Sequence, residues 1–216
     1  PAVRAAVANP ADDEEALRQT GDVLRLVTES GVSAEEEPWL AEVWLPDATG
    51  DLSAAGELWF PGSPLVEFLD VDTATYVVAD EVLSRWGREA LEAVGVRTGF
   101  ALVRDADVPL DEDVWHDLDD ESGWVDTVLA GVPDQELPPV LAELVAVRDL
   151  ELVRADAWPV VVSMLAADQL ARPALVQPAY LVLADGSRHA VPPYTAWWLR
   201  THARFGGRPL VELCAA

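Results

Sequence analysis

The chain has 216 residues, of which 50% are hydrophobic and 25% are charged, and this is the ordinary composition of a globular protein. Such a composition excludes disordered and collagen-like proteins. The net charge is −25, because 39 acidic residues stand against 14 basic ones. A surface of this charge repels duplex DNA, so we expect no nucleic-acid partner.

The sequence indicates a cytoplasmic protein without a membrane anchor. The longest uncharged apolar stretch, residues 157–167, is much shorter than the roughly 20 residues that cross a bilayer. The one cysteine, Cys214, has no partner for an internal disulfide. The chain starts at Pro1 rather than Met, and no basic and then apolar leader follows. We therefore expect a piece of a longer protein.

Helical and strand-like patterns alternate along the first half of the chain. The helical spacing of Leu17, Leu24 and Val27 predicts a helix that ends at Gly31. Asp80 is placed to cap a second helix, which has a clear apolar face. In chain order we expect a helix at 11–31, a hairpin of strands 41–45 and 56–60 around a turn at 46–50, a strand at 76–78, a helix at 80–95 and a strand at 100–103.

The second half begins with a strongly acidic segment. Residues 105–121 carry few apolar side chains, so we expect a loop that leads into a weak helix, which can extend to Leu129. The proline-rich residues 131–139 predict a linker. After it we expect a helix at 140–147, a strand at 150–153, a helix at 156–170 that Arg172 and Pro173 stop, a hairpin of strands 180–183 and 188–191, and a helix at 194–205.

These elements lack the regular alternation of strands and helices that is typical of a doubly wound sheet. We therefore predict an α+β fold of mixed helices and short antiparallel hairpins. The linker suggests two small subdomains with a boundary near residue 134. The first, 1–133, is acidic, and the second, 134–216, holds a hairpin and a C-terminal helix rich in Trp and Arg.

The densest polar cluster lies between residues 111 and 121 and includes His116. Its side chains are of the types that bind cations, but their spacing does not fit a calcium loop. A loop starting at Asp117 would place Ser122 where Gly is needed and Val128 where a bidentate Glu should stand. We predict no metal site and interpret the cluster as a solvated acidic face.

Catalytic motifs are not found in the sequence. Ser63 lies between prolines and not in a nucleophile elbow. Cys214 could pair with His189 or His202, but a lone cysteine near a chain end is more often inert. No glycine-rich phosphate loop is present. We expect neither catalysis nor a cofactor.

Positive charge is concentrated near the C-terminus. Residues 172–208 contain five arginines and one acidic residue, a net charge of +4, whereas residues 1–171 carry −28. In a helix over 194–205, Arg200 and Arg204 would share one face and could hold a phosphate or an acidic segment. The alternative is that these arginines pair with the chain's own acidic half. The candidate binding residues are Trp197, Trp198, Arg200, Arg204 and Arg208. One of the two adjacent tryptophan rings is expected to be exposed.

Three segments of the sequence resemble those of a known family. They are residues 58–65 (LWFPGSPL), 85–96 (RWGREALEAVGV) and 185–200, which contain DGS and VPPYTAWWLR. They are similar to the region downstream of the ATPase in large actinobacterial proteins with a sacsin N-terminal ATPase-like domain, and the similarity spans most of the chain. Those ATPases resemble heat-shock chaperones, whose nucleotide site needs a helical Asn, an Asp-x-Gly-x-Gly motif and a glycine-rich lid.

None of these nucleotide-binding motifs occurs in the chain. The resemblance therefore implies a non-catalytic accessory region of a larger chaperone-like ATPase, whose partner is another domain of the same polypeptide or a client protein. One alternative is a free-standing acidic protein that mimics nucleic acid and binds a basic partner. The other is a metal-dependent hydrolase that uses His116 and the carboxylates around it.

Overall fold

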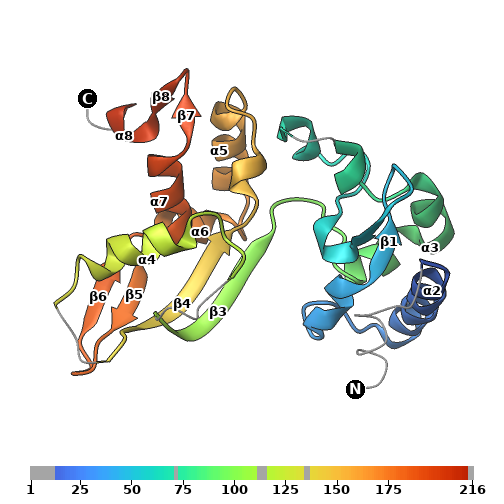
Figure 1. The fold of residues 1–216 in the computed structure, drawn as a ribbon, viewed down its shortest axis with the longest axis horizontal. Helices are drawn as coiled ribbons and strands as arrows, with labels where there is room; N and C mark the ends of the chain where they lie inside the picture. Colours follow the sequence, from blue (N-terminus) through green and yellow to red (C-terminus); the bar gives the residue numbers. More distant parts are fainter. Residues whose placement is uncertain (1–12, 71–72, 111–115, 134–136, 214–216) are drawn as a thin grey trace. The chain divides into compact units, whose positions relative to one another are not determined.

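The computed structural model describes residues 13–70, 73–110, 116–133 and 137–213 (Figure 1). Contacts divide the chain into two compact units, Pro1–Gly99 and Phe100–Ala216. Both contain helices and small antiparallel sheets, so the predicted α+β class is confirmed. Among the described residues, no helix is long and apolar enough to cross a membrane.

The described part of the first unit holds two α-helices and a short hairpin. Helix α2 spans Asp13–Ser30 and α3 spans Asp80–Ala93. Strands β1 and β2, Trp44–Pro46 and Leu52–Ala54, pair in antiparallel fashion and confirm the expected hairpin, although its second strand comes earlier than predicted. Short 3₁₀ turns complete the unit at Pro38–Glu42, Ala55–Glu57, Val66–Phe68 and Thr73–Tyr76.

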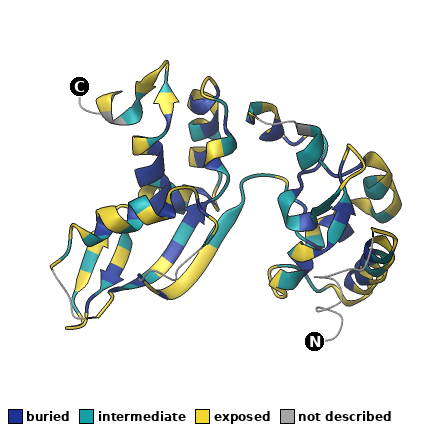
Figure 2. Ribbon diagram, in the orientation of Figure 1, coloured by how far each residue is buried: buried dark blue, intermediate teal, exposed yellow. Residues whose placement is uncertain are grey.

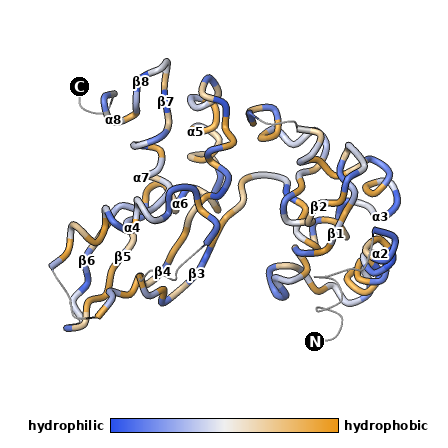
Figure 3. Tube along the Cα trace, viewed as in Figure 1, coloured by the Kyte–Doolittle hydropathy of each residue, from blue (hydrophilic) through white to orange (hydrophobic). Residues whose placement is uncertain are grey.

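The core of the first unit lies between α2, α3 and the hairpin. Leu24 of α2, Leu45 of β1 and Leu91 of α3 are all almost completely buried in it. Figure 2 shows the buried face of α2, and Figure 3 shows the hydropathy of the same residues. Leu17, which the helical spacing assigned to this face, is 44% exposed. The predicted turn after β1 is closed by the buried Asp47, whose Oδ1 accepts the backbone N–H groups of residues 49–51.

Helix α3 bends at Gly87, where the backbone has φ 77° and ψ 163°. This conformation is essentially limited to glycine. Asp80 stands in the first turn rather than at the N-cap, which is Ala79. The predicted end of the helix is confirmed, since Gly95 follows it with a φ of 97°.

The second unit is built on a four-stranded antiparallel sheet in the order β3-β4-β5-β6. The strands are Leu102–Pro109, Val140–Val147, Ala179–Val182 and Arg188–Val191. Strands β5 and β6 form the predicted hairpin. Strand β3 pairs along the whole of β4, so segments before and after the expected boundary at residue 134 share one sheet. The boundary between the two units along the chain instead lies between residues 99 and 100. Residue 134 lies outside the described residues.

The described part of this unit also contains four α-helices before a small C-terminal hairpin. The helices are α4 (Glu121–Leu129), α5 (Trp158–Ala167), α6 (Arg172–Val176) and α7 (Tyr194–Thr201). A 3₁₀ turn spans Leu150–Leu152. After α7, strands β7 (Arg204–Phe205) and β8 (Arg208–Pro209) form a hairpin that leads into α8 (Leu210–Leu213).

Several expected elements of this unit are of a different kind. Residues 140–147 form a strand instead of a helix, because both neighbouring strands pair with them. Residues 105–109, the start of the acidic segment that was expected in a loop, belong to β3. Residues 150–152 form a 3₁₀ turn instead of a strand. Arg172 and Pro173 begin α6 rather than only stopping α5, since proline is well tolerated in the first turn of a helix.

Two glycine substitutions in the first unit are expected to have opposite effects on stability. Gly87→Ala should lower the free energy of unfolding by about 1–3 kcal/mol, because a side chain is strained in that conformation. Gly21→Ala should raise it by about 0.5–1 kcal/mol, because Gly21 lies inside α2. Its new methyl group would lie 3.6 Å from a ring carbon of Trp86, an ordinary contact. Urea unfolding of both variants measures the two changes, and a shift of the same sign in both would contradict the assignment.

Candidate functional site

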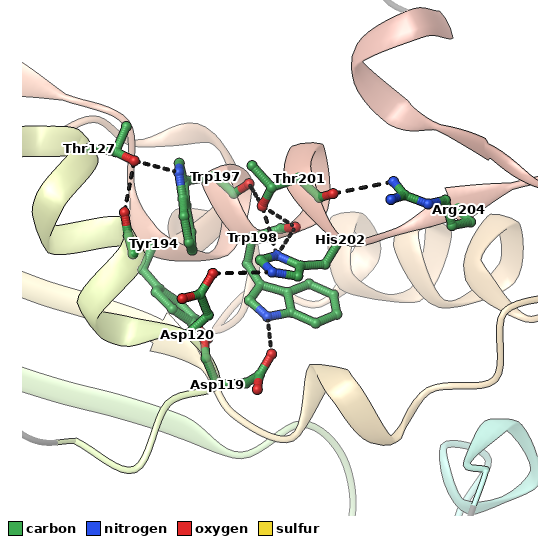
Figure 4. Close-up of polar contacts among 10 residues, drawn as sticks. Asp119, Asp120, Thr127, Tyr194, Trp197, Trp198, Thr201, His202 and Arg204 are labelled. Carbon is green, nitrogen blue, oxygen red and sulfur yellow. Dashed lines mark hydrogen bonds and ion pairs between the residues drawn. The ribbon is translucent and has the colours of Figure 1, made fainter.

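The predicted site residues are positioned by α7, and Figure 4 shows how they lie. The helix begins after Pro193, whose extended backbone leads into Tyr194. Tyr194, Trp197 and Trp198 are buried, whereas Arg200 in the last turn is exposed. The helix therefore has one broad aromatic face within the unit and a cationic end at the surface.

Both tryptophans of α7 are buried, with 9% and 4% of their surfaces exposed. The expectation of one exposed ring was wrong, because other helices contact α7 on more than one side. Trp197 Nε1 donates to Thr127 Oγ1 of α4 at 3.2 Å, and the Trp198 ring lies 5.5 Å from that of Trp158 of α5. These two rings stabilise the unit, and only a small part of Trp197 is left exposed.

The acidic turn before α4 is tied to this aromatic face. Tyr194 donates its hydroxyl hydrogen to the backbone carbonyl of Asp119 at 2.6 Å, and Trp198 Nε1 donates to the Asp119 carboxylate at 2.8 Å. The imidazole of His202 stacks on the Trp198 ring at 4.9 Å and lies 3.2 Å from the carboxylate of Asp120. Figure 4 shows this network. Part of the cluster that the sequence presented as a solvated acidic face is therefore structural.

Negative charge gathers around the tyrosine hydroxyl. Burial, followed by the charge of Asp119, raises the pKa of Tyr194 well above its ordinary value, so its hydroxyl stays a hydrogen-bond donor. Partial burial of the carboxyl, together with the charges of Asp149 and Asp119, also raises the pKa of Glu151. The carboxylates thus repel one another at neutral pH.

The three arginines occupy different elements from those expected. Helix α7 ends at Thr201, whose hydroxyl donates to the carbonyls of Trp197 and Trp198. Arg204 therefore lies in β7 and Arg208 in β8, and the positive φ angles of the glycines at 206 and 207 turn the chain between them. The prediction that Arg204 shares a helix face with Arg200 was wrong.

Arg200 and Arg204 nevertheless line one open groove, which we name the arginine groove. It has a volume of about 580 Å³. Its lining residues come from α4, α7, the β7–β8 hairpin and the segment before α7, and they are Thr127, Pro192, Trp197, Arg200, Thr201, Arg204 and Pro209. The pairing of Trp197 with these two arginines was predicted, whereas Trp198 and Arg208 do not line the groove. Thr127 and the two prolines were missed, since nothing in their local sequence marks them.

The arginines of the groove are available for a ligand. Arg204 Nη1 donates to the carbonyl of Thr201 at 3.2 Å, and Arg208 pairs with Glu212 in its own segment. Within the described residues of the second unit, no ion pair joins Arg200 or Arg204 to a carboxylate. The alternative that these arginines pair with the chain's own acidic half stays a prediction, because much of that half belongs to the first unit.

His116 is held between two carboxylates. Its Nδ1 lies 2.6 Å from Oε1 of Glu121, which is 2% exposed, and its Nε2 lies 3.3 Å from the carboxylate of Asp105. Both ring nitrogens are thereby engaged, whereas a metal ligand needs one of them free. Of the residues that the structure describes, no group of three or more His, Cys, Asp or Glu side chains could hold a metal ion. Residues 111–113 of the cluster lie outside that set.

Ser63, a further candidate nucleophile, is not placed for catalysis. The hydroxyl of Ser63 is buried and donates to the carbonyl of Thr98 at 3.0 Å. Cys214, which could have paired with His189 or His202, lies outside the described residues. The side chain of Ser63 therefore serves to hold two backbone segments together.

Comparison with known proteins gave no match: no family model, no curated protein and no solved structure is similar to this chain. A function for the chain must therefore be inferred from the geometry and charge of its own residues.

Replacing Glu151 should make stability depend on pH in a defined direction. The raised pKa means that the folded state binds this proton more tightly than the unfolded state, so the ionised carboxyl destabilises the fold at neutral pH. Glu151→Gln should raise the melting temperature at pH 7, and the gain should vanish as the pH falls below the ordinary value of 4.5. Melting curves between pH 8 and 4 measure this. A gain that does not change with pH would show that the carboxyl's charge is not the cause.

Proposed function

We propose that the chain is a non-catalytic protein-interaction module that binds an acidic segment in the arginine groove. The observation that carries the proposal is the position of Arg200 and Arg204. In a chain with a net charge of −25, these two exposed guanidinium groups lie in one groove, and no carboxylate in the described part of the second unit pairs with them.

The lining of the groove suits a carboxylate that has an apolar neighbour. Guanidinium groups bind carboxylates through two parallel hydrogen bonds, and such charged hydrogen bonds are stronger than neutral ones. The indole of Trp197 and the rings of Pro192 and Pro209 supply apolar surface beside them. The buried indole and the hydrogen bond of Trp197 to Thr127 fix this wall before a ligand arrives.

The family resemblance of the sequence suggests where the acidic segment comes from. If the chain is the region downstream of the ATPase in a chaperone-like protein, the acidic segment belongs to another domain of the same polypeptide or to a client protein. The sequence supports a non-catalytic role, because it contains no nucleotide-binding or nucleophile motif. Turnover of ATP by this chain alone would contradict that role. A cytoplasmic location fits the same proposal.

The alternative function is that of an acidic protein that mimics nucleic acid and binds a basic partner. It is favoured by the first unit, in which Glu35, Glu36 and Glu37 are all exposed side by side. A basic ligand would bind that surface through the attraction between opposite charges. Because salt screens this attraction, the affinity would fall steeply as the salt concentration rises. The two candidates therefore predict opposite ligand charges.

Binding of a labelled peptide distinguishes them. We expect a short fluorescein-labelled peptide of Glu and Leu to bind at physiological ionic strength, as measured by fluorescence anisotropy. The double variant Arg200→Ala/Arg204→Ala should weaken binding roughly tenfold or more, because charged hydrogen bonds contribute about 1.5–3 kcal/mol each.

The matched control removes two exposed arginines from α2. Arg18→Ala/Arg25→Ala changes the net charge equally, and both side chains lie far from the groove in sequence, with ion-pair partners in their own helix. It should leave the affinity unchanged. An equal loss in both double variants would exclude the groove. Binding of an oligolysine peptide and not of the acidic one would favour the alternative.

A further inference from the structure

One edge of β4 loses its strand partner part of the way along. Within the described part of the chain, β4 pairs with β5 only at Val140–Val182 and Leu141–Leu181. At the far end of the same strand, the N–H of Val147 donates to Oγ1 of Thr195 on α7 at 2.9 Å. Residues 142–145 lie between these two points; of these, 143–145 pair with β3, and none of the four is paired with β5.

The direction of the backbone groups follows from two hydrogen bonds at the end of β4. Arg148 N–H donates to the carbonyl of Ala101, which is toward β3, whereas Val147 N–H points to the opposite edge. In an antiparallel strand, alternate residues direct N–H and C=O to the same edge. The backbone groups of Glu143 and Val145 therefore face away from β3, on the side from which β5 has diverged.

A cavity of about 440 Å³ lies along this edge, and we name it the β4–β5 slot. Residues 142–145 form one side of it, and Ala179 and Tyr180 of β5 line the other. Pro173 of α6 and Tyr194 of α7 also line it. The volume is within the range of about 300–1,000 Å³ that is typical of ligand sites.

The lining of the slot includes an exposed aromatic ring and one side chain of each charge, Arg188 and Glu143. Tyr180 is 43% exposed, and the guanidinium of Arg188 on β6 lies 6.0 Å from its ring. An exposed aromatic ring beside an arginine is complementary to an apolar segment that carries a carboxylate.

We propose that the β4–β5 slot binds an extended peptide segment of a partner protein as an additional strand. The segment hydrogen-bonds to the backbone of Glu143 and Val145, packs apolar side chains against Tyr180, and directs a carboxylate to Arg188. Strand addition of this kind uses main-chain hydrogen bonds for affinity and side chains for specificity. The slot and the arginine groove share no lining residue, so this site is separate from the function proposed above.

Nuclear magnetic resonance of the ¹⁵N-labelled full chain tests the proposal. The probe is the peptide acetyl-Asp-Val-Thr-Val-Asp-amide, which carries a carboxylate at both ends so that no strand direction is assumed. We expect saturable shifts in the amide signals of residues 142–145 and Tyr180, and slower amide exchange at Glu143 and Val145. The same peptide with N-methyl groups at alternate residues should bind roughly tenfold more weakly, since it has lost main-chain donors.

Two variants separate this site from the arginine groove. Arg188→Glu should weaken binding of the probe roughly tenfold, because it replaces an attractive charge by a repulsive one. Arg200→Ala/Arg204→Ala should leave it unchanged. The proposal is overturned by any of three results: equal binding of the N-methylated peptide, shifts confined to the arginine groove, or no saturable shift at millimolar peptide. None of these would affect the result for the acidic peptide in the arginine groove.

Discussion

The burial of the aromatic face of α7 is the constraint on which the second unit depends. Tyr194, Trp197 and Trp198 each fill space within the unit, and each donates a polar hydrogen to α4 or to the turn before it. A buried donor left without an acceptor costs about 1–3 kcal/mol, so rotating α7 would lose packing and hydrogen bonds together. The helix therefore fixes the acidic turn on one side and carries Arg200 to the surface on the other.

This arrangement also explains how an acidic segment is stabilised in a chain with few cations. The carboxylates of Asp119, Asp120 and Glu121 are matched by an indole N–H and two imidazoles instead of by arginine side chains. Neutral donors and histidines thus hold the turn, and the arginines at the end of α7 are not needed for it. A groove lined by Arg200 and Arg204 can persist in so acidic a chain because other groups satisfy the nearest carboxylates.

The local sequence pattern correctly predicted those elements that depend mainly on residue spacing and turn residues. The helix that ends at Gly31 and the β5–β6 hairpin follow from spacing and turn residues, and both were confirmed. Residues 140–147 contain helix formers as well as valines, and only pairing with β3 and β5 makes them a strand. The end of α7 depends on tertiary packing in the same way: Ala203 is completely buried, which sets the chain's path before Arg204. The lining of the arginine groove thus depended on contacts between distant segments, which local sequence does not encode.

The two binding surfaces share a short rigid segment. Pro192 lines the arginine groove and Pro193 lines the β4–β5 slot, while the next turn of α7 contributes Trp197 to the first and Tyr194 to the second. Proline fixes the backbone angle φ, so the entry into α7 holds both linings in a defined relation. A partner with an acidic segment joined to an extended one would bind the second site at a high effective concentration once the first is occupied. Two sites that are weak individually would then suffice for stable association.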